Sequence, residues 1–451
     1  MLAVLCFHAD LGWAAGGFLG VSIFFTLSGF LITNLLLAEH ERSGTIALRA
    51  FYERRVRRLV PAALVVVGLV VAAGAWWASS QRDHLPGDVI TSLLDVANWR
   101  FATASRSYFD LFTSMPSPLA HFWSLAIEEQ CYLVLPVVAA WALRRGRRWF
   151  LAVLLVLAVG SLVATLATTD RNLVYNGTHT RAGELLVGAI AAVLVSRRRP
   201  SSLAHALLAW GGVASLLLLL ASATLRTGVL YRGGLFVVAI AAACTVVGLT
   251  GSHAPVRWLR WRWLVAVGRV SYGVYLFHWP VYLLLNEHRL AIGAYPLLAV
   301  RLVVTAGLAL CSYRLIEQPI RSGAAFARGV HLVGAWSASV AMLVVAALLA
   351  IPAPVYDATQ QLLREGTSGT LAFPEGSSAT GSSSPGSTTN PLEVMVVGSV
   401  PAVADRLRSD GLTVVDQTDA SCPVVPGVEQ RLATGEVLDT RRCVPLVDRL
   451  S

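Results

Sequence analysis

The sequence contains no lysine and little charge of either sign. All 36 basic side chains are arginine, and charged residues make up only 14% of the 451 residues, whereas 55% are hydrophobic. A soluble domain averages about a quarter charged residues. This scarcity of charge excludes a water-soluble fold for most of the chain, which we expect lipid to surround.

Long apolar runs predict an all-α polytopic membrane domain over residues 1–351. Crossing a bilayer takes about 20 predominantly apolar residues. Such runs lie near 17–38, 59–78, 119–143, 149–168, 182–195, 204–223, 233–250, 264–285, 295–313 and 332–351. A shorter segment, 1–9, lacks the basic region of a signal peptide, so we expect it to be the second half of a helix whose start is missing. The domain is therefore predicted to have 10 or 11 transmembrane helices.

The positions of the arginines predict the orientation in the plasma membrane. If successive helices alternate in direction, 19 arginines fall on one side, in segments 39–58, 144–148, 196–200, 251–263 and 314–330. The opposite segments, 10–16, 79–118, 169–181, 224–232 and 286–294, hold 8. Positive charge is retained in the cytoplasm, so the first set is predicted to be cytoplasmic. This topological reason for the net charge of +10 argues against a nucleic-acid partner.

The residues after 351 differ in composition from the membrane domain. Residues 352–391 are predicted to be a flexible linker, because 366–390 are rich in Gly, Ser, Thr and Pro. The patterns at 392–399 and 412–417 are typical of strands, and that at 405–411 is typical of a helix. Residues 392–451 are therefore expected to form an extracytoplasmic α/β piece, too short for a complete α/β domain.

Ionisable residues within the apolar runs or at their ends are candidates for function, because such residues are costly in lipid. They are His8, His121, Glu128, Glu129, Arg181, Glu184, His278 and Glu317. On one helix, His121, Ser124 and Glu128 share a face, and we expect Glu129 and Tyr132 to turn toward the adjacent face.

Each candidate also has a purely structural interpretation. His8 could hydrogen-bond to backbone at the membrane interface, and the two adjacent carboxylates could neutralise arginines between packed helices. His278 could cap the break that Pro280 makes in its helix. The arginines of residues 54–58 could serve only as a cytoplasmic anchor.

Taken together, the candidates favour acid–base chemistry. Three intramembrane histidines and two carboxylates could form a general-base site. The segment FYERRVRR (51–58) offers guanidinium groups, which suit phosphates because their fork of donors matches phosphate oxygens. The combination predicts an activated cytosolic donor that meets an acceptor within the membrane.

Seven motifs resemble, in order, those of the membrane acyltransferase-3 family, whose members O-acylate extracytoplasmic carbohydrates. They are FHA (7–9), GGFLGVSIFFTLSGFLIT (16–33), FYERRVRRLVPA (51–62), HFWSLAIEEQCYLVLP (121–136), TRAGELLVG (180–188), GRVSYGVYLFHWP (268–280) and YRLIEQP (313–319). The second and fourth are specific individually, and the set extends over residues 1–330.

The resemblance implies transfer of an acyl group, usually acetyl, from acyl-CoA bound on the cytoplasmic side to a hydroxyl of a cell-envelope glycan or glycolipid, without a metal. It implies catalytic roles for His8 and Glu128 and donor binding by Arg54, Arg55, Arg57 and Arg58. We expect Glu129, His121 and His278 to complete the catalytic group, and Tyr132, Arg181, Glu184 and Tyr275 to contact substrate.

Two alternatives remain open beside this interpretation. The first is a transporter or acyl exporter whose buried His and Glu residues form a proton relay. The second is an inactive remnant of an acyltransferase, because the family has an arginine one helix upstream of the His8 position, which here would precede Met1.

Residues 392–451 resemble the start of the SGNH-hydrolase-like domain that some family members carry. That domain begins with a strand followed by Gly-Asp-Ser. Here Ser399 follows Gly398 directly, and the aspartate is absent. A serine without its base is a poor nucleophile, so we expect no catalytic role for Ser399.

Cys422 and Cys443 are predicted to form a disulfide, because they lie in the predicted extracytoplasmic piece, where a disulfide persists. Alkylation of the intact protein without reductant should leave both thiols unlabelled. Labelling of both cysteines would contradict the pairing.

Overall fold

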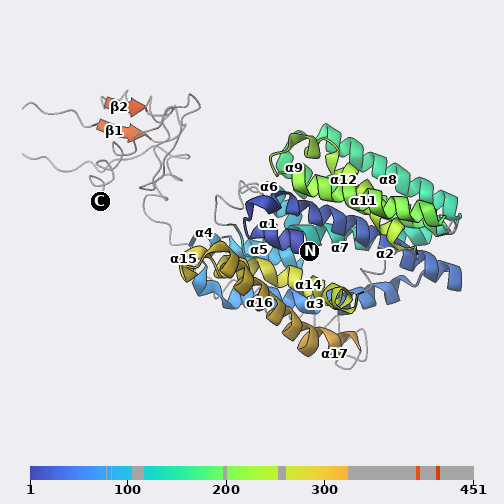
Figure 1. Cartoon of the computed structure of the whole chain (residues 1–451), viewed down its shortest axis with the longest axis horizontal. Helices are drawn as coiled ribbons and strands as arrows, with labels where there is room; N and C mark the ends of the chain where they lie inside the picture. Colours follow the sequence, from blue (N-terminus) through green and yellow to red (C-terminus); the bar gives the residue numbers. More distant parts are fainter. Residues whose placement is uncertain are drawn as a thin grey trace, which may run out of the picture. The chain divides into compact units, whose positions relative to one another are not determined.

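The computed structural model describes residues 1–77, 79–82, 84–103, 116–196, 201–251 and 261–322, together with the backbone of two strands at 393–396 and 413–416. The chain divides into two units, Met1–Gln361 and Leu362–Ser451. In the described residues, the regular structure of the first unit is helical, and that of the second is a pair of strands (Figure 1).

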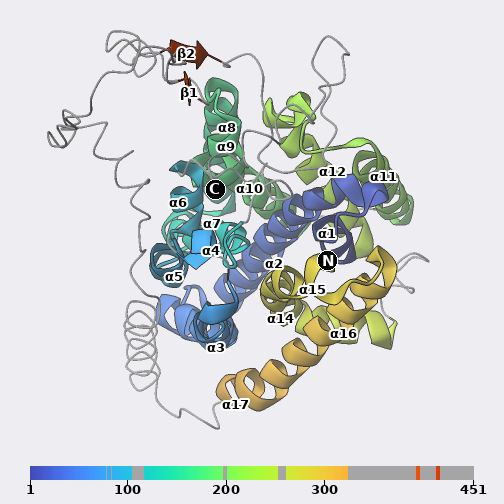
Figure 2. The same cartoon turned by 90° about the vertical axis from the view of Figure 1, so that its left-hand side faces the viewer.

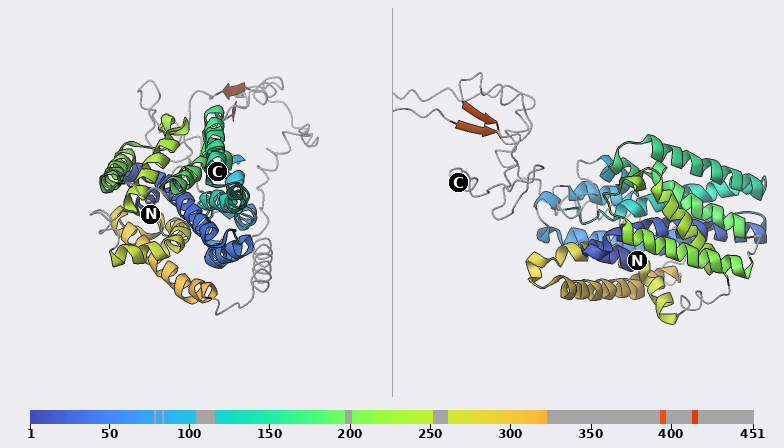
Figure 3. Two further views of the ribbon diagram at one scale, coloured as in Figure 1. Left: turned by 90° about the vertical axis from the view of Figure 1, so that its right-hand side faces the viewer. Right: turned by 45° about the horizontal axis from the view of Figure 1, so that its top comes forward.

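The helices of the first unit follow the predicted apolar runs. In chain order they are α1 (Leu2–His8), η1 (Gly12–Leu19), α2 (Gly20–Ser43), α3 (Leu48–Ala72), η2 (Gly74–Trp76), α4 (Ser79–Arg82), α5 (Leu85–Leu93), α6 (Ala97–Thr103), α7 (Phe122–Leu143), α8 (Arg147–Ala167), α9 (Arg171–Asn176), α10 (Thr178–Val195), α11 (Ser202–Ser222), η4 (Gly228–Tyr231), α12 (Gly234–Leu249), α14 (Arg262–Leu284), α15 (Glu287–Leu290), α16 (Ala294–Ser312), the π-helical turn η5 (Tyr313–Glu317) and α17 (Gln318–Arg321). The axes of most long helices are roughly aligned (Figure 3). The predicted run at 332–351 lies outside the described residues.

Six of the described stretches are long and apolar enough to cross a membrane. They are Gly12–Ser43, Phe122–Leu143, Arg147–Ala167, Arg171–Val195, Ser202–Ser222 and Ala294–Arg321. α3 and α14 have comparable lengths of 25 and 23 residues but contain more polar and charged side chains. The prediction of an all-α polytopic membrane protein is confirmed.

α3 begins eleven residues before the apolar run that predicts it. The helix starts at Leu48, whereas the run starts at 59. No glycine or proline interrupts residues 48–60, so the helix continues through the arginine segment. The arginines of residues 54–58 therefore lie on the first turns of α3, which continues into the bundle.

Two glycines bring α2 and α10 into backbone contact. A Cβ atom added at Gly29 would lie 1.9 Å from the carbonyl oxygen of Leu185, and one added at Gly188 would lie 1.9 Å from that of Thr26. Small residues permit such close approach of helices in a membrane. The crossing fixes α2, which runs through the middle of the bundle beside the short α1 (Figure 2).

Residues 79–118, which the sequence predicts to be an external loop, include a helical hairpin that enters the bundle. α5 and α6 turn at Asp95, whose φ is 53°. The amide of Gln130 donates to the carbonyl of Asp95 at 2.7 Å and to Asn98 Oδ1 at 2.9 Å. Because Gln130 lies eight residues into α7, the tip of the hairpin lies about 12 Å along that helix. Backbone at this depth requires protein partners in place of water.

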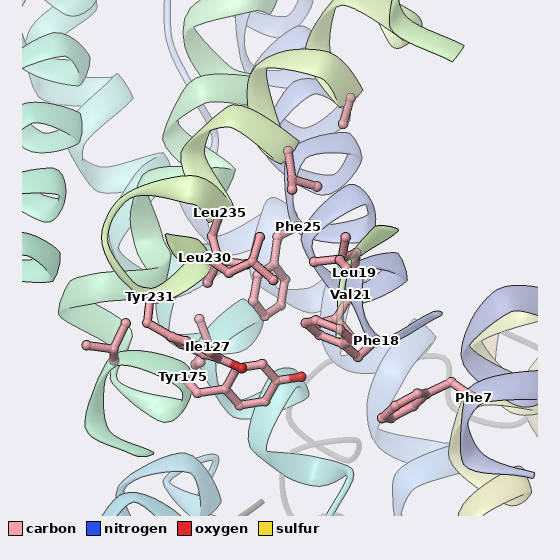
Figure 4. Packing of buried hydrophobic residues seen from close by; sticks show 14 of the residues in the cluster. Phe7, Phe18, Leu19, Val21, Phe25, Ile127, Tyr175, Leu230, Tyr231 and Leu235 are labelled. Carbon is pink, nitrogen blue, oxygen red and sulfur yellow. The ribbon is translucent and has the colours of Figure 1, made fainter. Parts of the chain in front are cut away.

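Aromatic side chains hold α7 against α2. Phe25 of α2, Ile127 of α7 and Tyr175 of α9 are 0% exposed and belong to one apolar cluster (Figure 4). The rings of Phe25 and Trp123 meet edge to face with centroids 6.2 Å apart. Such packing is the main force between helices in lipid, and here it sets the register of α7 beside its polar residues.

The second unit contains a parallel pair of strands, β1 (Glu393–Val396) and β2 (Thr413–Asp416), with Glu393 opposite Thr413. Both strands lie within the ranges predicted for them. Parallel strands need a crossover connection, as in an α/β fold. The predicted linker, the helix at 405–411, Ser399, Cys422 and Cys443 lie outside the described residues.

The α2–α10 crossing predicts that Gly188→Ala lowers the midpoint of thermal unfolding in detergent. The added Cβ meets backbone, which moves only if the helices separate, and overpacking costs about 1–3 kcal/mol. Gly160→Ala in α8 is the matched control, because nothing lies within 4 Å of a Cβ added there. Equal midpoints for the two variants would contradict the crossing.

Candidate active site

Three buried histidines from three segments converge. His8 ends α1, His121 precedes α7 and His278 lies in α14, and they are 8%, 2% and 0% exposed. The rings of His8 and His278 stack with centroids 5.0 Å apart, and the ring of His121 lies 5.7 Å from that of His278. We name these three residues the histidine group.

Both ring nitrogens of His278 have a partner. Its Nδ1 lies 2.5 Å from the carbonyl oxygen of Tyr275 in the same helix, and its Nε2 lies 2.9 Å from Nδ1 of His8. Pro280 lies two residues farther on and supplies no N–H to the helix. His278 therefore contacts the backbone of its own helix and also His8, but the carbonyl that it meets is not that of Leu276, which is the one left without a helical donor by Pro280.

His121 lacks a comparable set of contacts. Both of its ring nitrogens are buried without a well-aligned hydrogen-bond partner. The backbone of Leu276 interacts with the ring, and Leu276 is the residue whose carbonyl loses its helical donor at Pro280. The ring also packs against Tyr275 and Phe122. His121 is thus a buried imidazole that can offer a nitrogen to a ligand.

Tyr275 connects α14 to the start of α7. Its hydroxyl donates to the carbonyl of His121 at 3.2 Å and lies 2.6 Å from Oγ of Ser124. The ring centroid of Tyr275 is 5.3 Å from that of His278. Tyr275 therefore borders the histidine group and holds two of its members at a fixed spacing.

Glu128 belongs to a second polar group farther along α7. Its Oε1 accepts a hydrogen bond from Ser28 of α2 at 2.6 Å, and another from Tyr132. The guanidinium of Arg55 lies 3.3 Å from the centre of the Tyr132 ring, which is a cation–π contact. Glu128 is thus connected to the arginines of α3 through one tyrosine.

Tyr132 contributes to two faces of α7. The sequence predicts it beside Glu129, and both residues line one cavity. Its hydroxyl nevertheless turns toward Glu128. Residues four positions apart on a helix are neighbours, so the spacing of Glu128 and Tyr132 was a signal for this contact.

Glu128 lies apart from the histidine group. Glu128 lies seven residues after His121, which is about 10 Å along the helix axis. The residue that contacts Nδ1 of His8 is His278. The partner of this nitrogen is therefore an imidazole, and the helix face that His121 shares with Glu128 does not bring the two into contact over two turns.

The four arginines of residues 54–58 in α3 have different surroundings. Arg54 is exposed and pairs with Glu39 at 3.3 Å. Arg58 is exposed. Arg55 and Arg57 are partly buried, and the Nε atom of each is buried without a hydrogen-bond partner. Arg55 and Arg57 therefore have donors to offer an anion.

A cavity of about 500 Å³ extends from the arginines toward the histidine group. Its lining includes Tyr52, Arg55, Asp95, Phe122, Glu129 and Tyr132. From Leu133 to Phe122 it follows α7 for eleven residue steps, a length of about 16 Å. The ring of Phe122 lies 4.9 Å from that of His121, so the side chain of Phe122 lies between this end of the cavity and His121.

Arg181 and Glu184 are buried between helices, each 1% exposed. They form an ion pair with Nε and Oε1 3.1 Å apart, and Arg181 also donates to Ser22 Oγ at 3.3 Å. Three aromatic rings surround the guanidinium, those of Phe25, Trp123 and Tyr175. Neither residue lines the cavity beside α3. Their predicted contact with substrate stays a prediction.

Ser28 is a site residue that the sequence did not predict, because it is one of several hydroxyl side chains in the apolar run 17–38. Glu317 is a candidate to which the sequence assigns no role. Glu317 ends η5, accepts a hydrogen bond from Ser312 at 3.2 Å and approaches Gly273 of α14. Among the residues described, no three of His, Cys, Asp or Glu gather as ligands for a metal ion.

Comparison with known proteins gives a family and several relatives. The model of a family described as an acyltransferase domain matches residues 1–314. The peptidoglycan O-acetyltransferase OatA of Listeria monocytogenes serovar 1/2a is 37% identical over 345 residues, which cover 71% of this chain and 54% of that protein. The putative peptidoglycan O-acetyltransferase YrhL of Bacillus subtilis strain 168 is 37% identical over 349 residues, covering 71% and 53%.

A third relative is more distant. The O-acetyltransferase OatA of Staphylococcus aureus strain NCTC 8325 is 32% identical over 338 residues, which cover 71% of this chain and 55% of that protein. The chain thus spans about half the length of these curated relatives. No solved structure matches it. The family match extends over well more than half of the chain and includes the histidine group, Glu128 and the arginines of α3. The chain belongs to the acyltransferase-3 family of membrane proteins, as its motifs predict.

Proposed function

We propose that the protein is a membrane O-acyltransferase that moves an acyl group, most simply acetyl, from cytoplasmic acyl-CoA to a hydroxyl of an extracytoplasmic cell-envelope glycan or glycolipid. The observation that carries the proposal is the cavity beside α7. It starts at Arg55 and ends at Phe122, in contact with His121. A donor with a charged head and a long arm suits this shape.

The arginines of α3 bind the phosphates of the donor. Guanidinium groups pair with phosphate oxygens in a bidentate manner, and the Nε atoms of Arg55 and Arg57 are buried without partners. The flexible arm of CoA then extends along α7 and brings its thioester toward the histidine group. Binding in this way positions the thioester carbon before the acceptor hydroxyl arrives.

His8 acts as the general base in this reaction. It takes the proton of the acceptor hydroxyl while the hydroxyl oxygen attacks the thioester carbonyl. A C–O bond forms and the C–S bond breaks, and the leaving thiolate of CoA takes the proton from the imidazolium of His8, which restores the neutral base. His121, whose ring nitrogens are buried without aligned partners, supplies a hydrogen bond to the carbonyl oxygen or to the leaving sulfur.

Glu128 supports the donor end of the cavity. It accepts hydrogen bonds from Ser28 and Tyr132, and Tyr132 in turn packs against Arg55. The carboxylate therefore holds α2, α7 and α3 in one arrangement. Hydrogen bonds are stronger in the low dielectric of the bundle, so this network has a large effect on how the three helices are positioned.

The two substrates reach the site from opposite sides. The arginine distribution supports a cytoplasmic start of α3 and a position of His121 at the outer end of α7. The hairpin α5–α6 and α9 border the outer side, where Asn98 donates to the Asn176 carbonyl at 3.0 Å and Asn172 to that of Phe101 at 2.9 Å. We place residues 392–451 on the same side.

The acceptor class is supported by the relatives. Two of them are named as peptidoglycan O-acetyltransferases, one of them putative. A cell-wall glycan is accordingly the acceptor that we propose. Residues 392–451, whose paired strands suit an α/β domain, belong in this proposal to an SGNH-hydrolase-like piece on the outer side of the membrane, where the acceptor lies.

His8→Ala should lower acyl transfer by about 10²–10⁴-fold, the usual contribution of a positioned general base. Glu128→Gln should abolish transfer while insertion into the membrane stays intact. The measurements are the O-acetyl content of the envelope glycan in cells and the turnover of acetyl-CoA by the purified protein. Glu287→Gln in the exposed α15 is the control for Glu128→Gln.

These measurements also separate the enzyme from an exporter. An exporter without chemistry of its own would release no CoA from acetyl-CoA when purified. Unchanged O-acetyl content with Glu128→Gln, at equal amounts of protein in the membrane, would count against the proposed role of this carboxylate.

Substitutions of Arg181 and Glu184 can show whether this ion pair stabilises the bundle or contacts the substrate. Arg181→Met should destabilise the bundle by about 3–5 kcal/mol, because it leaves a buried carboxylate unpaired. The double variant Arg181→Met with Glu184→Leu should recover most of the midpoint of thermal unfolding. If Arg181→Met unfolds like the wild type but changes acceptor selectivity, the predicted substrate contact is correct instead.

A further inference from the structure

We infer that His278 is a positioning residue that fixes the tautomer of His8, so that Nε2 of His8 carries the lone pair that accepts the proton. The catalytic consequence rests on the proposed function. The tautomer itself rests only on the hydrogen bonds within the histidine group.

The first step concerns the proton on His278. Its Nδ1 lies 2.5 Å from the carbonyl oxygen of Tyr275. A carbonyl oxygen can only accept a hydrogen bond, so Nδ1 carries a hydrogen and donates it. A neutral imidazole has one N–H, and Nε2 of His278 therefore has a lone pair.

The second step concerns the proton on His8. Nε2 of His278 lies 2.9 Å from Nδ1 of His8, which is the length of a hydrogen bond between nitrogens of this kind. Because Nε2 of His278 is an acceptor, Nδ1 of His8 must be the donor. In neutral His8 the lone pair is then on Nε2.

Neutral rings suit this part of the bundle. His8 and His278 are 8% and 0% exposed, and burying an isolated charge is costly. The titratable rings that face His278 are those of His121, Tyr275 and Tyr282. Neither a histidine nor a tyrosine carries a negative charge that would favour an imidazolium here.

The residues after His278 hold its ring and that of His8 in place. Trp279 donates its indole N–H to the carbonyl of Ser117 at 2.9 Å, and its ring centroid is 4.8 Å from that of His8. His8 is thus enclosed by two consecutive residues of α14. The segment HWP (278–280) supplies a hydrogen-bond acceptor, a packing surface and a local break in the helix.

A second histidine has an advantage over a carboxylate in this position. The hydrogen bond that one ring nitrogen makes decides which nitrogen is basic, and soluble enzymes often use a carboxylate for that purpose. An ionised carboxylate in lipid is costly, whereas a neutral imidazole whose own tautomer is set by backbone costs less. His278 thus orients His8, and the carbonyl of Tyr275 in turn orients His278.

The tautomer can be measured without an activity assay. Nitrogen-15 NMR of the full-length protein, labelled at histidine and reconstituted in lipid bilayers, distinguishes a protonated from an unprotonated ring nitrogen. The difference between wild-type and His8→Gln spectra isolates His8. We expect a protonated Nδ1 and an unprotonated Nε2. A His8 ring protonated at Nε2 would overturn the inference, even if His8→Ala proves inactive and the proposed function holds.

Two substitutions of His278 show whether it acts through its hydrogen bond to His8 or only through packing. The side-chain oxygen of His278→Gln can accept the Nδ1–H of His8, so we expect acetyl transfer within about tenfold of wild type. His278→Leu cannot accept it and should lose about 10²-fold. A leucine variant at least as active as the glutamine variant would show that His278 only fills space.

A matched control is available in α11. His205 is also buried and its Nδ1 also contacts a carbonyl one turn earlier, that of Ser201 at 3.1 Å. His205→Leu should leave acetyl transfer unchanged. If His8→Ala keeps full activity, the proposed function fails, while the NMR result still decides the tautomer.

Discussion

Hydrocarbon offers no hydrogen bonds, so every polar side chain in the bundle needs a partner from another helix or from its own backbone. α7 shows how far this constraint shapes the molecule. Its Ser124, Glu128 and Tyr132 reach α14, α2 and α3 in turn. Apolar side chains alone would let these helices pack in many ways, because lipid is as apolar as they are. The polar face of α7 selects one arrangement and places the cavity beside it.

The helices were largely predictable because length and composition are local properties. Each apolar run within the described residues corresponds to a helix. α3 starts eleven residues before its run, because nothing in residues 48–60 ends a helix. The hairpin α5–α6 could not be found in this way. It is short, and its depth depends on hydrogen bonds from Gln130 of α7, which no local pattern reveals.

The members of the candidate site were predictable, but their pairing was not. His8 and His278 are 270 positions apart in the chain, and nothing in the sequence says that they touch. The shared face of His121 and Glu128 suggested one site, although seven residues separate them by about two turns. Ser28 was not predicted because nothing distinguishes it from the other hydroxyl residues of its apolar run until its partner, Glu128, is known. The order of the motifs, in contrast, was enough to identify the family.

The glycine crossing of α2 and α10 has a mechanical consequence. Gly29 and Gly188 press each helix onto the backbone of the other, so the two cannot slide, and Ser28 ties α7 to the same rigid body. α7, which lines one side of the cavity, is therefore held to this rigid pair of helices. α3 lines the opposite side, and neither of the two glycines contacts it. A donor in the cavity thus meets one side that backbone contact between two neighbouring helices holds in place, and a second side that this contact does not reach.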